Sequence, residues 1–129
     1  MITMRQALKV TALEKMVRSE PDCGSCRFHP TVDFIGFSGH FPNFPILPAM
    51  LQVLLGIIVS EELYGSSLTL QKLDKAKFMV QIKPEQTITV SCHLSRMPNK
   101  ESQPGAKARI TITVAEQKAA SMTLFLDEI

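Results

Sequence analysis

The spacing of apolar residues changes at Gly65. Before Gly65, residues 48–64 are apolar at almost every position and leave almost no polar face, which is typical of a buried helix. Pro48 suits the first position of a helix, and Gly65 suits its C-terminal end. The sequence therefore predicts one buried helix over 48–64, about 25 Å long.

After Gly65, apolar and polar residues alternate with a period of two, which predicts β-strands. The alternation slips at 74–77, so we expect a β-bulge there. Turns are expected at 83–85 and 116–118, and a polar loop at 98–105. The strands expected from this pattern are 68–82, 88–94, 106–114 and 120–126.

Four strands joined by short connections predict an antiparallel meander with one apolar face. The long helix over 48–64 is the element that can cover this face. We therefore expect an α+β fold in which an antiparallel β-sheet wraps around one long central helix. The length of 129 residues fits a single domain over residues 1–129.

The first third of the chain is less clearly patterned. Residues 1–22 fit a helix about as well as an irregular strand, and 25–37 read as extended. Cys23, Cys26 and His29 have a metal-like spacing, but a structural zinc site needs four ligands and a second pair is not evident. A turn is the favoured interpretation of this segment, and we expect no metal.

Composition narrows the classes of function. The apolar content of 45% and the net charge of +2 describe an ordinary globular protein and do not indicate nucleic-acid binding. The start lacks the apolar core of a signal peptide, and the apolar stretch 44–59 is too short and interrupted to span a bilayer. An odd number of cysteines favours a reducing compartment, so we expect a cytoplasmic protein.

Candidate chemistry lies in 39–54, which reads GHFPNFPILPAMLQVL. The prolines of this stretch stiffen the chain that leads from His40 to the helix. A helix N-terminus also presents free backbone N–H groups to anionic oxygen. A titratable histidine held beside such a terminus is a plausible catalytic group.

Three segments of the chain carry a family resemblance: Gly39-His-Phe-Pro42, Pro45-Ile-Leu-Pro48, and the lysine–phenylalanine strand that ends in Lys77-Phe78 before the 83–85 turn. Together they resemble the β-hydroxyacyl-acyl-carrier-protein dehydratases of the FabA/FabZ type, which have the hotdog fold. The resemblance covers roughly residues 28–126. It implies a dimer whose two sheets join, with active sites at the subunit boundary.

The resemblance implies specific roles. His40 would be the base that removes a proton next to a thioester. A carboxylate 14 residues later, on the central helix of the other subunit, would help the hydroxyl leave as water. Substrate would be carried as a phosphopantetheine thioester on acyl carrier protein or CoA, with no other cofactor. The resemblance also implies that the substrate contacts Phe41, Asn43, Pro48, Ala49, Met50 and Phe78.

The chain departs from the family pattern at the acid. Leu54 occupies the position of the carboxylate, and Asn43 and Ala49 replace glycines. Gln52 cannot transfer a proton readily, which leaves Asp33 as the substitute to consider. A positioned acid or base contributes about 10²–10⁴ in rate, so the lone chain is expected to be a poor catalyst.

Three hypotheses follow from these residues. The first is a dehydratase-like protein of fatty acid or polyketide-like biosynthesis that binds acyl thioesters and gains its acid from a related hotdog subunit. The second is a non-catalytic acyl-binding or structural subunit, and the third is a hotdog thioesterase that uses Asp33. Lys72, Lys75, Lys77 and Lys83 are either a basic rim for an acidic carrier or phosphate, or simply solvated strand residues.

Overall fold

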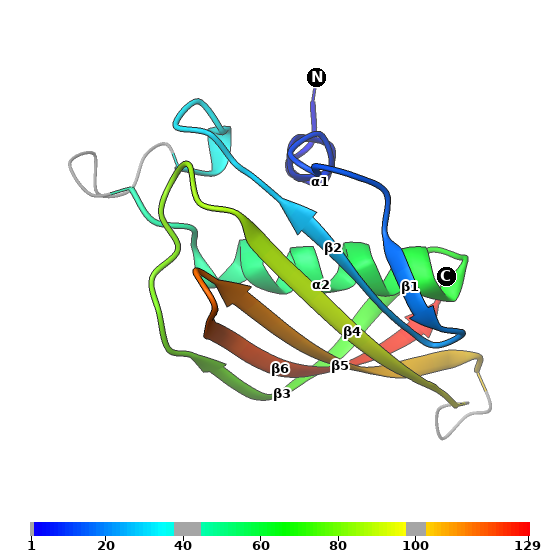
Figure 1. The fold of residues 1–129 in the computed structure, drawn as a ribbon. Coiled ribbons are helices and arrows are strands. Elements are labelled where there is room, and N and C mark those ends of the chain that lie inside the picture. Colours follow the sequence, from blue (N-terminus) through cyan, green and yellow to red (C-terminus); the bar gives the residue numbers. More distant parts are fainter. Residues whose placement is uncertain (1, 38–44, 98–102) are drawn as a thin grey trace.

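The computed structural model describes residues 2–37, 45–97 and 103–129, and Figure 1 shows their arrangement. Six strands form one antiparallel sheet in the order β1-β2-β4-β5-β6-β3, and the helix α2 lies across one face of it. This confirms the predicted α+β fold. The elements in chain order are α1 (Met4–Lys9), β1 (Val17–Glu20), β2 (Cys23–Phe28), η1 (Ile35–Phe37), α2 (Ala49–Tyr64), β3 (Leu68–Phe78), β4 (Ile88–Arg96), β5 (Gly105–Val114) and β6 (Gln117–Glu128).

The predicted central helix is confirmed as α2. Pro48 is its N-cap, with φ −61° and ψ 150°, rather than its first helical residue. Gly65 ends it in the left-handed conformation at φ 91°, where its N–H donates to the Glu61 carbonyl at 2.8 Å. A glycine tolerates this φ without steric cost, so the residue that the sequence marks as a stop ends the helix.

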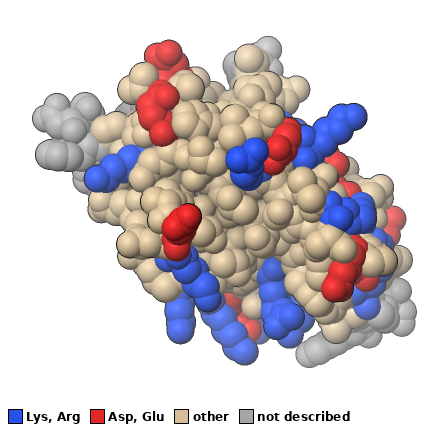
Figure 2. Space-filling view, viewed as in Figure 1, with Lys and Arg blue, Asp and Glu red and all other residues tan. Residues whose placement is uncertain are grey.

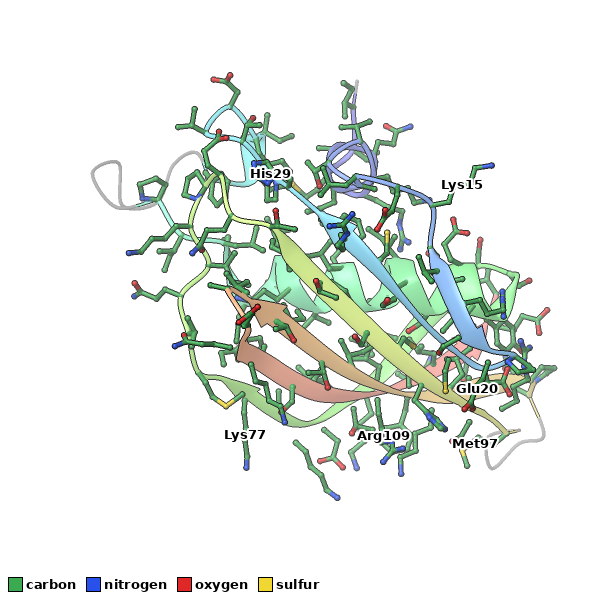
Figure 3. All side chains as sticks on the ribbon, in the orientation of Figure 1. Lys15, Glu20, His29, Lys77, Met97 and Arg109 are labelled. Carbon is green, nitrogen blue, oxygen red and sulfur yellow. The ribbon has the colours of Figure 1, made fainter. Side chains whose placement is uncertain are left out.

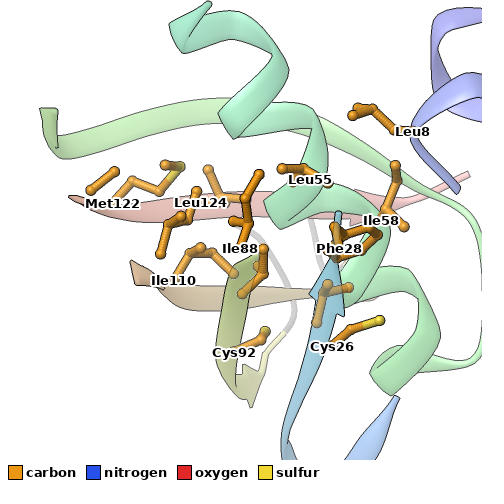
Figure 4. Close-up of a cluster of buried hydrophobic side chains, with 14 of the residues drawn as sticks. Leu8, Cys26, Phe28, Leu55, Ile58, Ile88, Cys92, Ile110, Met122 and Leu124 are labelled. Atoms are coloured by element: carbon orange, nitrogen blue, oxygen red, sulfur yellow. The ribbon is translucent and has the colours of Figure 1, made fainter. Parts of the chain in front are cut away.

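One face of α2 packs on the apolar face of the sheet. Leu55 and Ile58 on this face are buried in one cluster with Phe28, Ile88 and Leu124 from the strands (Figure 4). Burial of such side chains contributes about 1.5–3 kcal/mol each. This packing fixes the helix against the sheet and thereby sets the position of its first turn.

The expectation that α2 is buried all round is wrong for the single chain. Met50 is 82% exposed, and Val53, Leu54 and Ile57 are only half-buried. The sheet covers one side of the helix, which leaves an apolar strip along another side. A purely apolar sequence cannot show which of its faces the same chain will cover.

The predicted four-strand meander is only partly correct. β4, β5 and β6 are consecutive neighbours, but β3 pairs with β6, not with β4. Residues 79–87 form a long connection, in which the Ile82 carbonyl accepts a hydrogen bond from the Leu47 N–H at 2.8 Å. The chain therefore passes the start of α2 between β3 and β4, a route that alternation alone does not specify.

Local irregularities of the sheet were largely predictable. The bulge expected at 74–77 is confirmed by a register shift between Asp74 and Lys77 and by the positive φ of Lys75, 52°. The turn between β5 and β6 lies at Ala115 and Glu116, one residue earlier than expected. β3 ends at Phe78, and residues 79–82 do not extend the strand as predicted.

Residues 2–22 contain both a helix, α1, and a strand, β1, the two kinds of element that the sequence allowed there. α1 begins with a capping box formed by Thr3 and Gln6, and β1 and β2 pair through a turn at Pro21. The extended segment expected over 25–37 continues only to Phe28 and is followed by the short helix η1. Within the described residues, no helix is long and apolar enough to cross a membrane.

Candidate functional site

The first turn of α2 leaves backbone donors exposed. No side chain caps Pro48, and the N–H groups of Leu51 and Gln52 both donate to its carbonyl, at 3.0 and 3.2 Å. In the described part of the chain, the N–H groups of Ala49 and Met50 have no partner, and both residues are exposed. Free donors at the positive end of a helix stabilise a developing negative charge on oxygen.

Gln52 braces the segment that leads into this turn. It is 4% exposed, and its side-chain amide donates to the Leu47 carbonyl at 3.2 Å. The Leu47 N–H in turn donates to the Ile82 carbonyl. These bonds join α2, the segment before it and the 79–87 connection at the start of the helix. The amide oxygen of Gln52 is buried and has no partner among the described residues, which carries a cost of about 1–3 kcal/mol.

Sequence reasoning examined Gln52 only as a substitute acid and missed this bracing role. The available signal was a polar residue within the apolar first half of the helix. A buried amide in such a place usually has a hydrogen-bonding task.

Leu54 lies on the half-buried strip of α2, two residues beyond Gln52. The carboxylates of α2 are Glu61 and Glu62, both in its last turn. Glu61 forms an ion pair with Arg5 and accepts a hydrogen bond from the Leu68 N–H at 2.9 Å. Glu61, the half-buried carboxylate of α2, is therefore already engaged at the C-terminal end of the helix, far from its first turn.

Asp33 is exposed beside α1. It lines a mainly apolar hollow of about 780 Å³ together with Val10, Phe34 and Ile35. Phe34 and Phe37 stack edge to face, with ring centroids 5.5 Å apart, and fix this turn. His40, Phe41 and Asn43 lie outside the described residues, and the roles expected for them and for Asp33 stay predictions.

Phe78 lies at the end of β3, the edge strand of the sheet. It is 42% exposed, and its neighbours Met79 and Leu73 are also exposed. An edge strand with apolar side chains is a ready surface for pairing with another chain. The position of Phe78 does not show whether it contacts a substrate, so that role stays a prediction.

Cys23 and Cys26 do not form the predicted turn. Cys23 and Cys26 lie in β2, and the turn precedes them. The Cys23 thiol lies 3.2 Å from Nδ1 of His93 on the exposed face, whereas Cys92 is buried, which raises the pKa of its thiol to about 11. Among the described residues, no three His, Cys, Asp or Glu side chains gather as a metal site requires.

The four lysines considered as a basic rim lie in β3 and in the connection that follows it. Lys72 lies over the Phe125 ring, 5.6 Å from its centroid. Lys75 and Lys77 line a hollow on the sheet, and Lys83 lies in the 79–87 connection. Their role as a rim for an acidic carrier or phosphate stays a prediction.

Comparison with known proteins identifies the family. The family model of the ApeI dehydratase (ApeI-like) matches residues 16–121. The chain belongs to the ApeI-like dehydratase family. Its FabA/FabZ-like resemblance and its hotdog fold are thereby confirmed.

Individual relatives agree with this membership in the ApeI-like family. The 3-hydroxyacyl-[acyl-carrier-protein] dehydratase FabZ of Chlamydia abortus is 30% identical over 97 residues, which cover 68% of this chain and 63% of that protein. The chain thus spans less than two thirds of that relative's length.

Two solved structures share the fold. The dehydratase heterocomplex ApeI:P of Xenorhabdus doucetiae superposes with a TM-score of 0.72 at 15% identity, covering 91% of this chain and 96% of that one. A hypothetical thioesterase with coenzyme A from Streptococcus pneumoniae gives 0.70 at 7% identity, covering 98% and 94%. At these identities both comparisons show the hotdog fold and nothing about activity.

Proposed function

We propose that this protein is a dehydratase-like subunit that binds 3-hydroxyacyl thioesters of acyl carrier protein or CoA, in fatty acid or polyketide-like biosynthesis. We further propose that a related hotdog subunit supplies the catalytic acid. Membership of the ApeI-like family and the FabZ relative support the substrate class. The absence of an acid at the start of α2 supports the dependence on a partner.

The proposed reaction converts a 3-hydroxyacyl thioester into a 2-enoyl thioester and water. His40 takes the proton from C2, and the thioester carbonyl oxygen becomes negatively charged. The free N–H groups at the start of α2 donate to that oxygen, which lowers the barrier to proton removal. The C3–O bond then breaks, and an acid of the partner subunit donates the proton that turns the leaving hydroxyl into water.

The observation that carries this proposal is the engagement of two carboxylates, Glu61 and Glu85, in contacts with other parts of the chain, whereas Asp33 is exposed and stays the substitute acid to be tested. Glu61 is held by Arg5 and Leu68 at the far end of α2. Glu85 in the 79–87 connection accepts a hydrogen bond from Val32 at 2.9 Å and lies 3.5 Å from His29. A carboxylate committed to such contacts is a poor proton donor to a substrate at the start of α2.

Two exposed surfaces of the chain support the proposal that it pairs with a second subunit of the hotdog fold. The half-buried strip of α2 and the edge strand β3, with its exposed Leu73 and Phe78, are surfaces that a second subunit would cover. One structural neighbour is itself a dehydratase heterocomplex, although at 15% identity. A partner of the same fold could place its own helix beside the strip and thereby bring a carboxylate to the site.

The test measures formation of 2-enoyl thioester from 3-hydroxyacyl-carrier-protein by the purified chain, alone and with a related hotdog subunit that retains the helix carboxylate. We expect activity to rise about 10²-fold or more on mixing. A His40→Ala chain mixed with the same partner is the control and should lose this gain. Equal activity with and without the partner would refute the dependence, and release of free thiol without enoyl product would indicate a thioesterase.

A further inference from the structure

The outer face of the sheet, opposite α2, is polar over a large area. Its centre holds two rows of residues that face one another across β2, β4, β5 and β6. A hollow of about 580 Å³ lies over these rows, separate from the start of α2. The rows are Cys23–His93–Arg109–Thr123 and Ser25–Ser91–Thr111–Ser121.

The residues that line this hollow are positively charged overall. They include the cations Lys75, Lys77 and Arg109 and six serine or threonine hydroxyls, but no carboxylate. Lys77 and Arg109 extend from the same side of the sheet in Figure 3, and Figure 2 shows Lys and Arg side chains gathered along that side. Among the described residues, no carboxylate oxygen lies within 4 Å of these three charged groups.

The β-bulge in β3 creates this concentration of charge. Lys72 and Asp74 lie opposite outer-face residues of β6, so unbroken alternation would turn Lys75 and Lys77 toward the α2 side. The register shift between Asp74 and Lys77 instead brings Lys77 opposite Ser121 on the outer face. Two lysines thereby join Arg109 at the hollow, and the carboxylate of Asp74 belongs to the residue opposite Thr123 at its edge.

Other cations on the same face have partners. Lys72 and Lys107 lie over the Phe125 ring, 5.6 and 5.8 Å from its centroid. Cations over an aromatic ring gain about 0.5–1 kcal/mol at exposed sites. The cations of the hollow have no such contact among the described residues, which leaves their donors available.

We infer that this hollow binds a tetrahedral oxyanion of the phosphate class, as free phosphate or as a phosphate monoester. Arg109 supplies a planar pair of donors suited to phosphate oxygens, and the lysines add charge from the opposite side. Ser121 on β6 lies between the strands of Arg109 and Lys77, and Thr111 and Ser91 continue its row across β5 and β4, so their hydroxyls can donate to the remaining oxygens. This site does not depend on the proposed dehydratase reaction, because it lies on the other face of the sheet.

The test is a titration of the ¹⁵N-labelled full chain with inorganic phosphate, followed by amide chemical shifts at constant ionic strength. We expect saturable shifts confined to Ser91, Arg109, Thr111 and Ser121. Arg109→Gln and Lys77→Gln should each weaken binding about threefold to tenfold. Lys107→Gln, on the same strand and face but engaged with Phe125, is the matched control and should leave binding unchanged.

A parallel titration with methyl phosphate separates the two sources of the ligand. Equal or tighter binding of the ester would indicate a phosphorylated metabolite or cofactor, and binding of inorganic phosphate alone would indicate the free ion. Shifts that do not saturate, or that are the same in Arg109→Gln and Lys107→Gln, would overturn the inference. Either result is independent of dehydratase activity, since no thioester substrate is present.

Discussion

The two ends of α2 differ in how their polar groups are satisfied. At the C-terminal end, Arg96 donates to the Leu63 and Tyr64 carbonyls, and its guanidinium lies 4.7 Å from the Tyr64 ring. Tyr64 donates to Glu128 at 2.8 Å, and Glu61 bridges Arg5 and Leu68. At the N-terminal end, the N–H groups of Ala49 and Met50 and the oxygen of Gln52 have no partner among residues 2–37, 45–97 and 103–129.

This contrast separates stability from function within one helix. Groups with partners hold the helix to α1 and to the strands, whereas the Gln52 oxygen, buried and without a partner among the described residues, costs stability. In the described part of the chain, the last carbonyls of α2 accept hydrogen bonds from Arg96, whereas the N–H groups of Ala49 and Met50 at its start have no partner. The following predictions change one end at a time.

The largest effect is expected from restoring an acid near the N-terminal end. Leu54→Glu places a carboxyl group at the position that the family uses, on a half-buried strip where it can be accommodated. We expect the lone chain to gain about 10²-fold in dehydration of a 3-hydroxyacyl thioester. Enzyme kinetics with the variant alone measures this.

The control for this gain is Leu54→Gln, which has nearly the same size and cannot transfer a proton readily. It should remain as inactive as the unchanged chain. A folded Leu54→Glu variant without any gain would show that the site differs from the family pattern in more than its acid.

A smaller effect is expected at the C-terminal end. Glu61→Gln removes the ion pair with Arg5 and weakens the bond from the Leu68 N–H, which should lower the free energy of unfolding by about 1–3 kcal/mol. Urea denaturation measures this loss. Ligand binding at the opposite end of α2 should be unaffected.

Glu62→Gln provides the matched control, because Glu62 is adjacent and exposed. Its change in stability should be within about 0.5 kcal/mol. Equal losses in the two variants would contradict the idea that Glu61 anchors this end of the helix.

Most of the fold was predictable from local pattern. The limits of α2 follow from Pro48 and Gly65, and the bulge of β3 follows from the slipped alternation at 74–77. Strand order was not predictable, because periodicity defines the faces of a strand but not its neighbours. The pairing of β3 with β6 therefore appeared only in the structure.

The candidate site was predictable only in part. The resemblance of residues 39–48 pointed to the start of α2, and the missing acid at Leu54 is visible in sequence. The bracing role of Gln52 could not be predicted from the sequence, because it depends on the Leu47 carbonyl lying within reach of the Gln52 side chain. The engagement of Glu61 likewise requires Arg5, 56 residues away, to fold beside it.

The most direct test of the central claim is the turnover of a 3-hydroxyacyl thioester by the unchanged protein in the absence of any partner subunit. The account predicts that formation of the 2-enoyl product does not exceed that of the His40→Ala variant, because in the proposed mechanism the chain supplies the base and the N–H donors and the partner supplies the acid. Turnover by the lone protein that is lost in His40→Ala would contradict it, since the chain would then hold its own complete catalytic site.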